Sequence, residues 1–272
     1  MNRLAVIMSV YCSDRLDYLE EAFSSLLAQD FVDFDIYINI DGDIPSDLND
    51  YLSKQLDLNE NLFIYRTEVN QGLASSLNRL IEEILVKEQY YYIARMDSDD
   101  ICDSSRFRKQ VEFMDNDKSV DISGSYCREF GASYALDLKK VPLTHEELVN
   151  FSLLRCPFIH PTVIFRTEVL KDGNRYPTDT HLTEDMAFWF QLLDRGYRFA
   201  NLGLPLLQYR LNEDTVKRRQ GFKKGFHETV LRFGYMLKWK KITLKNTLLI
   251  LVRLFFHMLP VDMIKYLYKN RR

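Results

Sequence analysis

Short apolar runs alternate with amphipathic segments from residue 4 to residue 96, and this alternation constrains the fold more than any other feature of the sequence. The runs are typical of β-strands: LAVIMSV (4–10), FDIYINI (34–40), NLFIY (61–65) and YYYIARM (90–96). Segments between them, such as DYLEEAFSSLLAQ and GLASSLNRLIEEILVKE, place their leucines on one face of a helix. Strands that alternate with helices in this way predict an α/β fold with a mostly parallel sheet flanked by helices.

The pattern is less regular after about residue 121. Three segments predict further strands: DISGSYCREFG, TVIFR (162–166) and LPLLQYRL. The segment THEELVNFSLL predicts a short helix that begins with a capping box of Thr144 and Glu147, and EDMAFWFQLLDRG predicts a helix that ends at Gly196. No flexible linker interrupts these elements, so residues 1–216 are predicted to form one domain whose halves are about 1–120 and about 121–216.

Charge is divided unevenly along the chain. Residues 217–272 hold 15 Lys and Arg residues against two acidic residues, a formal charge of +13, and the totals of 36 basic and 39 acidic residues leave −16 for residues 1–216. The tail also carries an apolar run from Leu248 to Leu259, too short to span about 30 Å of hydrocarbon as a helix. A basic amphipathic helical tail predicts binding to an anionic membrane surface.

An alternative for the tail is that it packs on the body of the protein or on a second copy of the chain, as in a homodimer. The acidic body predicts that nucleic acid is not a partner. The four cysteines include no C-x-x-C pair, which is typical of a reducing compartment, and the first apolar run is short for a signal peptide. We therefore expect a cytoplasmic protein that is peripheral on the inner face of the membrane.

Four carboxylates, Asp97, Asp99, Asp100 and Asp103, follow the fourth predicted strand within seven positions. Neighbouring carboxylates repel one another and are costly to bury, so a cation is expected beside them. Asp97 and Asp99 are two residues apart, which turns both to the same side of an extended chain, and their hard oxygens suit Mn²⁺ or Mg²⁺. The alternative is a solvated acidic turn that caps the next helix.

Further polar residues follow the other predicted strands, and ligands of open α/β sheets bind outside the carboxyl ends of the strands. Tyr11 follows the first strand and offers a stacking face. Asp41 follows the second and offers an acceptor for a uracil imide or a ribose hydroxyl, although a plain turn at Asp41 and Gly42 is the alternative. With a metal site at the same edge, these residues predict a nucleoside diphosphate as ligand.

The chain resembles the family 2 glycosyltransferases of bacterial polysaccharide synthesis, which have the GT-A fold, built on a Rossmann-like sheet. The resemblance covers roughly residues 3–216 and rests on these stretches, in the family's order: VIMSVY, LEEAFSSLLAQ, INIDG, NQGLASSLN, RMDSDD, RFRKQVEFM, HPTVIFR, TEDMAFWFQLLDRGY and LLQYR. One turn, IDGDIPSD, departs from the Asp-Asp-Gly-Ser form of many relatives.

The family implies transfer of a sugar, with inversion at the anomeric carbon, from a nucleotide-sugar donor such as a UDP-sugar to a hydroxyl of a saccharide acceptor. Many relatives use acceptors linked to polyprenyl diphosphate in the synthesis of O-antigen or capsule. The resemblance therefore implies a metal-dependent hexosyltransferase with a nucleotide-binding first half, an acceptor-binding second half and a lipid-linked saccharide acceptor.

The resemblance also implies roles for single residues. It assigns the donor nucleotide to Val10, Tyr11, Asp41, Asn70, Gly72, Asp97 and Ser98, and the metal to Asp97 and Asp99. Four arginines, Arg95, Arg210, Arg218 and Arg219, are candidates for contact with the diphosphate. Arg95 has the alternative role of offsetting the carboxylates, and the others that of a solvated basic face.

The segment Thr183-Glu184-Asp185 matches the family motif whose aspartate is the general base. The resemblance therefore implies that Asp185 removes a proton from the acceptor and that Glu184 positions it, whereas helix capping is the alternative. His160, in the family's His-Pro segment, borders the acceptor or the metal, or is a core histidine.

Two other functions stay open. One is a sugar-nucleotidyltransferase, although the first loop, SVYCSDR, lacks the glycines that hold a triphosphate. The other is a non-catalytic, membrane-attached subunit that binds a nucleotide-sugar.

Overall fold

The protein is built around one eight-stranded sheet. The computed structural model describes residues 3–180, 183–218, 221–256 and 259–271. Within them the strand order is β3-β2-β1-β4-β7-β6-β8-β5. The strands are β1 (Leu4–Tyr11), β2 (Phe34–Asp41), β3 (Leu62–Thr67), β4 (Tyr92–Arg95), β5 (Ile101–Cys102), β6 (Ile122–Phe130), β7 (Ile164–Arg166) and β8 (Phe199–Arg210).

The direction of the strands within the sheet reverses between β4 and β7. The strands β3, β2, β1 and β4 are parallel, whereas β7 is antiparallel to both β4 and β6. These pairings confirm the predicted strands and their mostly parallel first half. The two-residue strand β5 lies inside the stretch predicted as an acidic turn, and Ile101 pairs there with Gln208 of β8.

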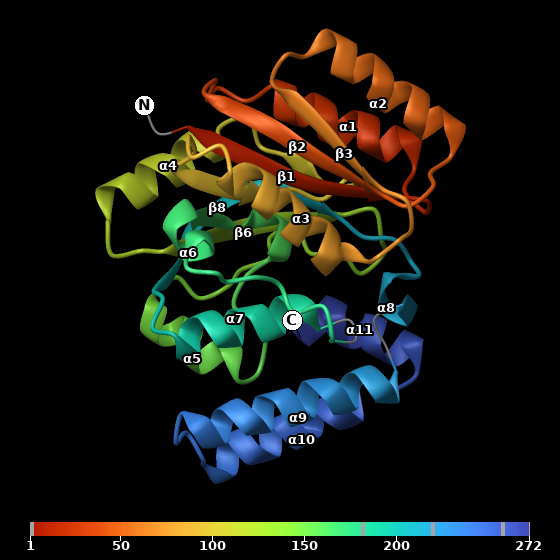
Figure 1. The fold of residues 1–272 in the computed structure, drawn as a ribbon. Coiled ribbons are helices and arrows are strands. Elements are labelled where there is room, and N and C mark those ends of the chain that lie inside the picture. The colour runs from red at the N-terminus through yellow and green to blue at the C-terminus, as the bar shows by residue number, and fades with distance from the viewer. Residues whose placement is uncertain (1–2, 181–182, 219–220, 257–258, 272) are drawn as a thin grey trace.

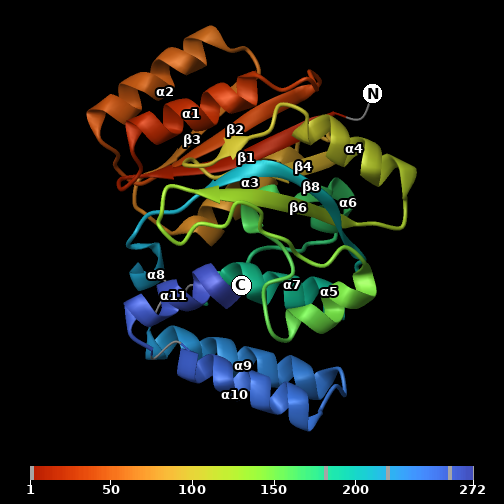
Figure 2. The ribbon, with the colours of Figure 1, turned by 180° about the vertical axis from the view of Figure 1, so that it is seen from behind.

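Helices cover both faces of the sheet. One face is covered by α1 (Leu16–Leu27), α2 (Ser46–Leu58) and α4 (Arg106–Asn116), the other by α3 (Leu73–Leu85), α5 (His145–Ser152), α6 (Thr167–Lys171) and α7 (Glu184–Asp194). Val6 and Met8 of β1 pack into the first layer, and Ala5 and Ile7 into the second. Figures 1 and 2 show α1 and α2 above the sheet and α5 and α7 below it.

The predicted capping box and helix end are both present. Glu147 accepts from the backbone N–H of Thr144, and the side chain of Thr144 in turn caps the first turn of α5. Gly196 follows α7 with φ +89°, a left-handed conformation that favours glycine after a helix. Residues 160–162 form a single 3₁₀ turn before β7.

The C-terminal region is helical, as predicted. It holds α8 (Thr215–Arg218), α9 (Phe222–Lys238), α10 (Leu244–Phe256) and α11 (Val261–Arg271). The helices α9 and α10 lie side by side below α7 (Figures 1 and 2). The ring of Phe190 in α7 stacks on that of Tyr235 in α9, with the ring centroids 4.5 Å apart. The tail thus packs on the body of the protein, which was the alternative to membrane binding.

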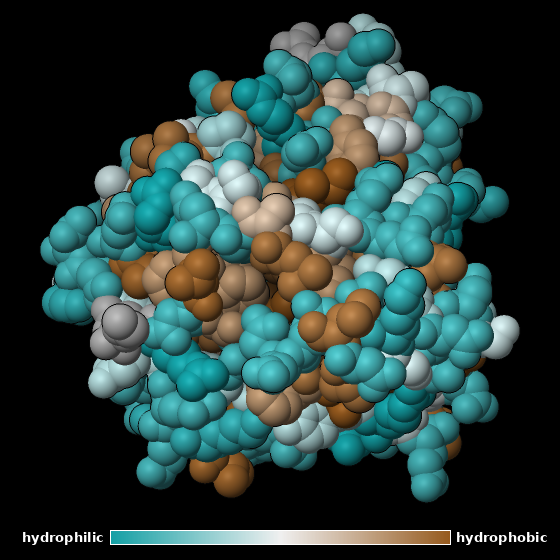
Figure 3. Space-filling view, turned by 90° about the horizontal axis from the view of Figure 1, so that it is seen from above, coloured by the Kyte–Doolittle hydropathy of each residue, from teal (hydrophilic) through white to brown (hydrophobic). Residues whose placement is uncertain are grey.

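The surface differs between the two ends of the molecule. The face remote from α9 and α10 is hydrophilic around its rim, and apolar side chains gather towards its middle (Figure 3). On α10, by contrast, Leu244, Leu248 and Phe255 are all more than half exposed. None of the helices in the described ranges has the length and apolar character needed to cross a membrane.

Candidate active site

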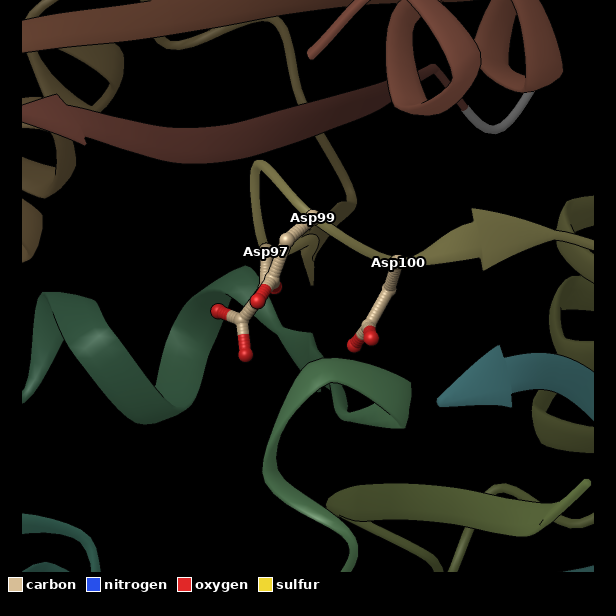
Figure 4. A group of neighbouring side chains, drawn as sticks. All are labelled: Asp97, Asp99 and Asp100. Atoms are coloured by element: carbon tan, nitrogen blue, oxygen red, sulfur yellow. The ribbon is translucent and has the colours of Figure 1, made fainter. Parts of the chain in front are cut away.

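Three of the four clustered carboxylates converge. Asp97, Asp99 and Asp100 each present an oxygen that lies within 4.8 Å of the other two, and Figure 4 shows their side chains leaving the loop after β4 on the same side. The fourth, Asp103, is exposed and accepts from the backbone N–H of Ser105 at 3.0 Å, just before α4. The hypothesis of a metal site therefore concerns Asp97, Asp99 and Asp100, whereas the alternative of an acidic turn before the next helix describes Asp103.

The converging carboxylates fit a divalent cation. Asp97 and Asp99 are partly exposed, whereas Asp100 is fully buried and accepts the backbone N–H of Arg210 at 2.7 Å. Hard oxygens that meet at one point are the ligands that Mn²⁺ and Mg²⁺ prefer. Asp100 therefore fastens the loop to β8, whereas Asp97 and Asp99 remain partly exposed to solvent.

Arg95 supplies a buried positive charge beside the cluster. Its side chain is fully buried, and Nη2 forms an ion pair with Asp97. Its backbone carbonyl accepts from Arg106 of α4 at 2.8 Å. Nε and Nη1 of Arg95 have no hydrogen-bond partner among the described residues. Because buried donors are nearly always hydrogen-bonded, these two nitrogens have capacity for a further acceptor.

Asp14 joins the first loop to the acidic loop. Its Oδ2 accepts hydrogen bonds of 3.0 Å from the backbone of Tyr11 and from the hydroxyl of Ser98. Burial raises the pKa of Asp14 to about 7, and the charges of Asp99 and Asp97 add to the rise. The sequence does not single out Asp14, which looks like an ordinary turn residue in SVYCSDR.

The three first strands end together at the same edge. Tyr11, Asp41 and Thr67 are paired across β1, β2 and β3. Tyr11 is 36% exposed and presents a ring face to solvent, whereas the side chain of the preceding Val10 is buried in the core. This edge is where the predicted base site lies.

Asp41 is buried and holds the loop before α3. Its oxygens accept from the backbone N–H groups of Gln71 and Gly72, both at 2.9 Å, and from the hydroxyl of Thr67 at 3.0 Å. Asn70 donates in turn to the carbonyl of Asp41 at 3.3 Å. The structure thus brings the predicted nucleotide residues Asp41, Asn70 and Gly72 together, while contact with a base stays a prediction.

The candidate base stands at the start of α7. Oδ1 of Asp185 accepts the backbone N–H of Met186 at 2.7 Å, and Oδ2 lies 3.7 Å from the thiol of Cys156. Burial raises the pKa of the neighbouring Glu184, with a further rise from Asp185 and a fall from Lys224 and Arg95. Because each carboxylate oxygen can accept more than one hydrogen bond, Asp185 keeps the capacity to accept another.

Tyr176 is a buried residue that is influenced by the charges of both the candidate base and the acidic loop. Its backbone is fixed by both side-chain groups of Asn78 in α3, at 2.8 and 2.9 Å. Burial raises the pKa of Tyr176, and the charges that act on its hydroxyl are those of Arg95, Asp185, Asp97 and Glu184. The charges of these four predicted residues therefore all act on one phenol, which the sequence does not single out.

His160 also contacts Tyr176. Its Nε2 lies 3.2 Å from the tyrosine hydroxyl, and its ring meets Trp189 edge-on at 5.9 Å. The half-buried imidazole thus sits at the wall of the same site, with the aromatic surroundings of a core residue.

Arg210 is engaged with the acidic loop. Its Nε donates to the carbonyl of Asp99 at 2.7 Å, and Nη2 donates to Glu21 at 2.5 Å. Arg218 is the last residue of α8, and Arg219 lies outside the described residues. Diphosphate contact by these arginines stays a prediction.

Known proteins share both the sequence and the fold. The family model described as glycosyl transferase family 2 matches residues 5–173. An amylovoran biosynthesis glycosyltransferase of Erwinia amylovora is 29% identical over 269 residues, 98% of each chain. UDP-Gal:α-D-GlcNAc-diphosphoundecaprenol β-1,3-galactosyltransferase of Escherichia coli is 28% identical over 98% of this chain and 96% of its own.

Solved structures agree at the level of the fold. The crystal structure of S. aureus TarS 1–349 in complex with UDP superposes with a TM-score of 0.62 at 17% identity, covering 98% of this chain and 87% of that one. The mannosyltransferase PcManGT of Pyrobaculum calidifontis, in complex with GDP-Man and Mn²⁺, gives a TM-score of 0.62 at 13% identity, covering 98% and 72%. The chain therefore has the GT-A fold and belongs to glycosyl transferase family 2.

Proposed function

We propose that the chain is an inverting, metal-dependent hexosyltransferase that moves a sugar from a UDP-sugar to a saccharide hydroxyl in the synthesis of a bacterial surface polysaccharide. The observation that carries the proposal is the convergence of Asp97, Asp99 and Asp100, whose carboxylate oxygens lie within 4.8 Å of one another, beside the buried Arg95, which pairs with Asp97. Asp185, whose charge acts on Tyr176 together with those of Asp97 and Arg95, supports the assignment of a proton acceptor to the same site. The names of two relatives, an amylovoran biosynthesis enzyme and a UDP-Gal-dependent galactosyltransferase, support the donor and the pathway type.

The donor diphosphate would lie against the acidic loop. Asp97 and Asp99 would hold Mn²⁺ or Mg²⁺, which neutralises charge on the departing nucleoside diphosphate. Arg95, with two buried nitrogens that lack a partner among the described residues, offers donors for the same phosphates. Tyr11 would stack on the base at the ends of β1 and β2, and the loop of Asn70 and Gly72 would border it.

The acceptor would approach from α7. Asp185 takes the proton of the acceptor hydroxyl, whose oxygen then forms a bond to the anomeric carbon as the bond from that carbon to the diphosphate breaks. Attack and departure on opposite faces of the sugar invert its configuration. Glu184, whose pKa is raised by burial, would position the acceptor beside Asp185.

The acceptor is proposed to be a saccharide on polyprenyl diphosphate, as the printed name of the E. coli relative describes for that enzyme. The charge of +13 on residues 217–272 and the exposed apolar residues of α10 support attachment to the inner face of the cytoplasmic membrane. A peripheral enzyme of this kind meets a lipid-linked acceptor at the surface where that acceptor resides.

Measurement of UDP release tests the function. Purified protein is incubated with Mn²⁺, a panel of UDP-sugars and a lipid-linked saccharide, and Asp185→Asn is compared with Asp194→Asn at the other end of α7. We expect UDP release to fall at least a hundredfold in Asp185→Asn and to stay near the wild-type rate in Asp194→Asn. Release of pyrophosphate would favour a nucleotidyltransferase, and an undiminished rate in Asp185→Asn would favour a non-catalytic binding role or another base.

A further inference from the structure

Helix α9 carries an exposed apolar stripe. Phe222, Phe226, Val230 and Leu237 recur at helical spacing, with exposed fractions from 50% for Phe226 to 59% for Phe222. The rings of Phe222 and Phe226 lie 6.1 Å apart and nearly parallel. Met236, on another face of the same helix, is buried against the body. The exposed stripe is therefore a different face of α9 from the one that packs on the body of the protein.

The stripe borders a cavity of about 260 Å³. Four of the lining residues belong to α9 (Phe226, His227, Val230 and Leu231), and the other three are Asp179, Thr180 and Thr183. The apolar lining thus comes from α9, which also contributes the imidazole of His227, and the hydroxyl and carboxylate groups come from the other segment. A single amphiphilic molecule matches this division, whereas the flat surface of a bilayer cannot enter a space between two segments of the chain.

The polar side of the cavity leads to the candidate base. Thr183 is the residue directly before Glu184 and Asp185, at the start of α7. The hydroxyl oxygen of Thr180 is buried and has no hydrogen-bond partner among the described residues. Hydroxyl and carboxylate groups are suited to the hydroxyls of a sugar, and Asp179 at the exposed rim adds a further acceptor.

Positive charge stands at the start of α9. Lys223 and Lys224 lie in its first turn, and the N-terminus of the helix adds the positive end of a helix dipole. Lys224 precedes the cavity residue Phe226 by two positions, and its charge lowers the pKa of Glu184, in which burial causes the larger rise. An anionic group is therefore favoured near the N-terminus of α9.

We propose that this cavity and stripe bind the lipid-diphosphate part of the acceptor. The cavity residue Thr183 directly precedes Glu184 and Asp185 in the chain, and Lys224 precedes the cavity residue Phe226 by two positions. A saccharide joined through a diphosphate to an aliphatic chain combines the same three kinds of group, which are hydroxyls, an anion and an apolar chain. This inference rests on the proposed function and adds the residues that select a lipid-linked acceptor over a free saccharide.

Binding of farnesyl diphosphate tests the proposal. The probe is titrated into full-length protein that holds saturating UDP and Mn²⁺, so that the donor site is filled, and inorganic diphosphate and farnesol are titrated in parallel. UDP binding is measured separately on every variant. We expect farnesyl diphosphate to bind at least tenfold more tightly than either of the other two, because it alone fills both sides of the site.

Variants of α9 locate the site. We expect Phe226→Ala to weaken farnesyl diphosphate about tenfold through lost apolar burial, and Lys224→Ala to weaken it about fivefold without affecting farnesol. Leu237→Ala, on the same stripe but outside the cavity, should retain the wild-type affinity. All three side chains are at least partly exposed, and unchanged melting temperatures will show that the variants are folded.

Several outcomes would overturn the proposal. Equal losses of farnesyl diphosphate affinity in Phe226→Ala and Leu237→Ala would show that the probe adsorbs to the whole stripe. The same conclusion would follow if the protein bound phosphatidylglycerol vesicles through both residues equally and did not bind soluble farnesyl diphosphate. If inorganic diphosphate bound as tightly as farnesyl diphosphate, the apolar side chains of α9 would contribute nothing to binding, which would contradict their proposed role. Failure of UDP binding alone would contradict the proposed function and leave this site standing.

Discussion

Oδ2 of Asp41 accepts the backbone N–H of Gly72 at 2.9 Å and thereby ties the end of β2 to the start of α3. Oδ1 accepts the N–H of Gln71 at the same distance. Gly72 has φ +86°, a left-handed conformation that favours glycine, so the loop reaches its N–H groups to the carboxylate without strain. A residue predicted to read the base therefore also shapes the loop that borders it.

The substitution Asp41→Asn should destabilise the protein. The new side-chain amide presents an NH₂ group where the carboxylate accepts, so one buried backbone N–H loses its partner, at a cost of about 1–3 kcal/mol in the free energy of unfolding. Urea denaturation will measure this loss. Asp43→Asn, an exposed neighbour in the same turn, is the control and should change stability by less than about 0.5 kcal/mol. Equal effects of the two variants would contradict the loop-holding role.

Removal of Asp99 should abolish metal-dependent stabilisation. We expect Mn²⁺ with UDP to raise the melting temperature of the wild type, because a ligand that binds the folded state alone stabilises it. Asp99→Ala should lose the part of this shift that needs Mn²⁺. Asp103→Ala removes a carboxylate of the same cluster that faces α4 and should keep it. If Asp99→Ala retained the full shift, the cation would have to bind elsewhere.

Asp14 should make the metal-free protein less stable as pH rises. Its folded pKa of about 7 lies above the ordinary value near 4, so its contribution to stability is fully present below about pH 4 and is lost as pH rises towards 7. The melting temperature without metal should therefore fall less between pH 5 and pH 8 in Asp14→Asn than in the wild type. Asp17→Asn, at an exposed position in the next helix, should keep the wild-type slope.

Glu228 should matter for the attachment of the tail. It pairs with Arg232 at 3.6 Å and with Arg253 of α10 at 2.9 Å, and Arg232 donates to the carbonyl of Ser152 at 2.7 Å. Because Glu228 and Arg232 are buried, Glu228→Gln leaves positive charge unbalanced and should cost about 3 kcal/mol of unfolding free energy.

The control for Glu228 is an exposed ion pair in the same region. Glu213 lies 2.5 Å from Lys265 of α11, with its side chain half exposed. Glu213→Gln should cost no more than about 1 kcal/mol in the same denaturation experiment. A loss in Glu213→Gln as large as in Glu228→Gln would show that burial does not set the strength of these contacts.

The strands could be predicted because burial on both faces leaves an unbroken apolar run in the sequence. Val6 and Ile7 are adjacent, yet they pack into different layers, and each must be apolar. The strand β5 could not be predicted in this way, because two residues have no periodicity. Its position is set by pairing with Gln208, which is remote in sequence.

The site could be predicted where a residue follows a strand or begins a helix. Asp41, Asp97 and Asp185 meet these criteria, and their proposed roles stay predictions: Asp41 holds the loop of Gly72, Asp97 lies beside Asp99 and Asp100, and Asp185 stands in the first turn of α7. Asp14 and Tyr176 carry no such local signal. Their roles arise from contacts with Ser98 and Asn78 that close across the fold, and sequence spacing contains no information on those contacts.

The direct pairing of β4 with β7 joins the two halves of the domain by backbone hydrogen bonds. Ile93 lies opposite Phe165, so the half predicted to bind the donor and the half predicted to bind the acceptor share one continuous ladder. A rigid-body hinge between them would have to break that ladder. Entry of substrates and exit of products therefore depend on movements of loops around a fixed frame, and turnover should be more sensitive to loop stiffness than to any separation of the halves.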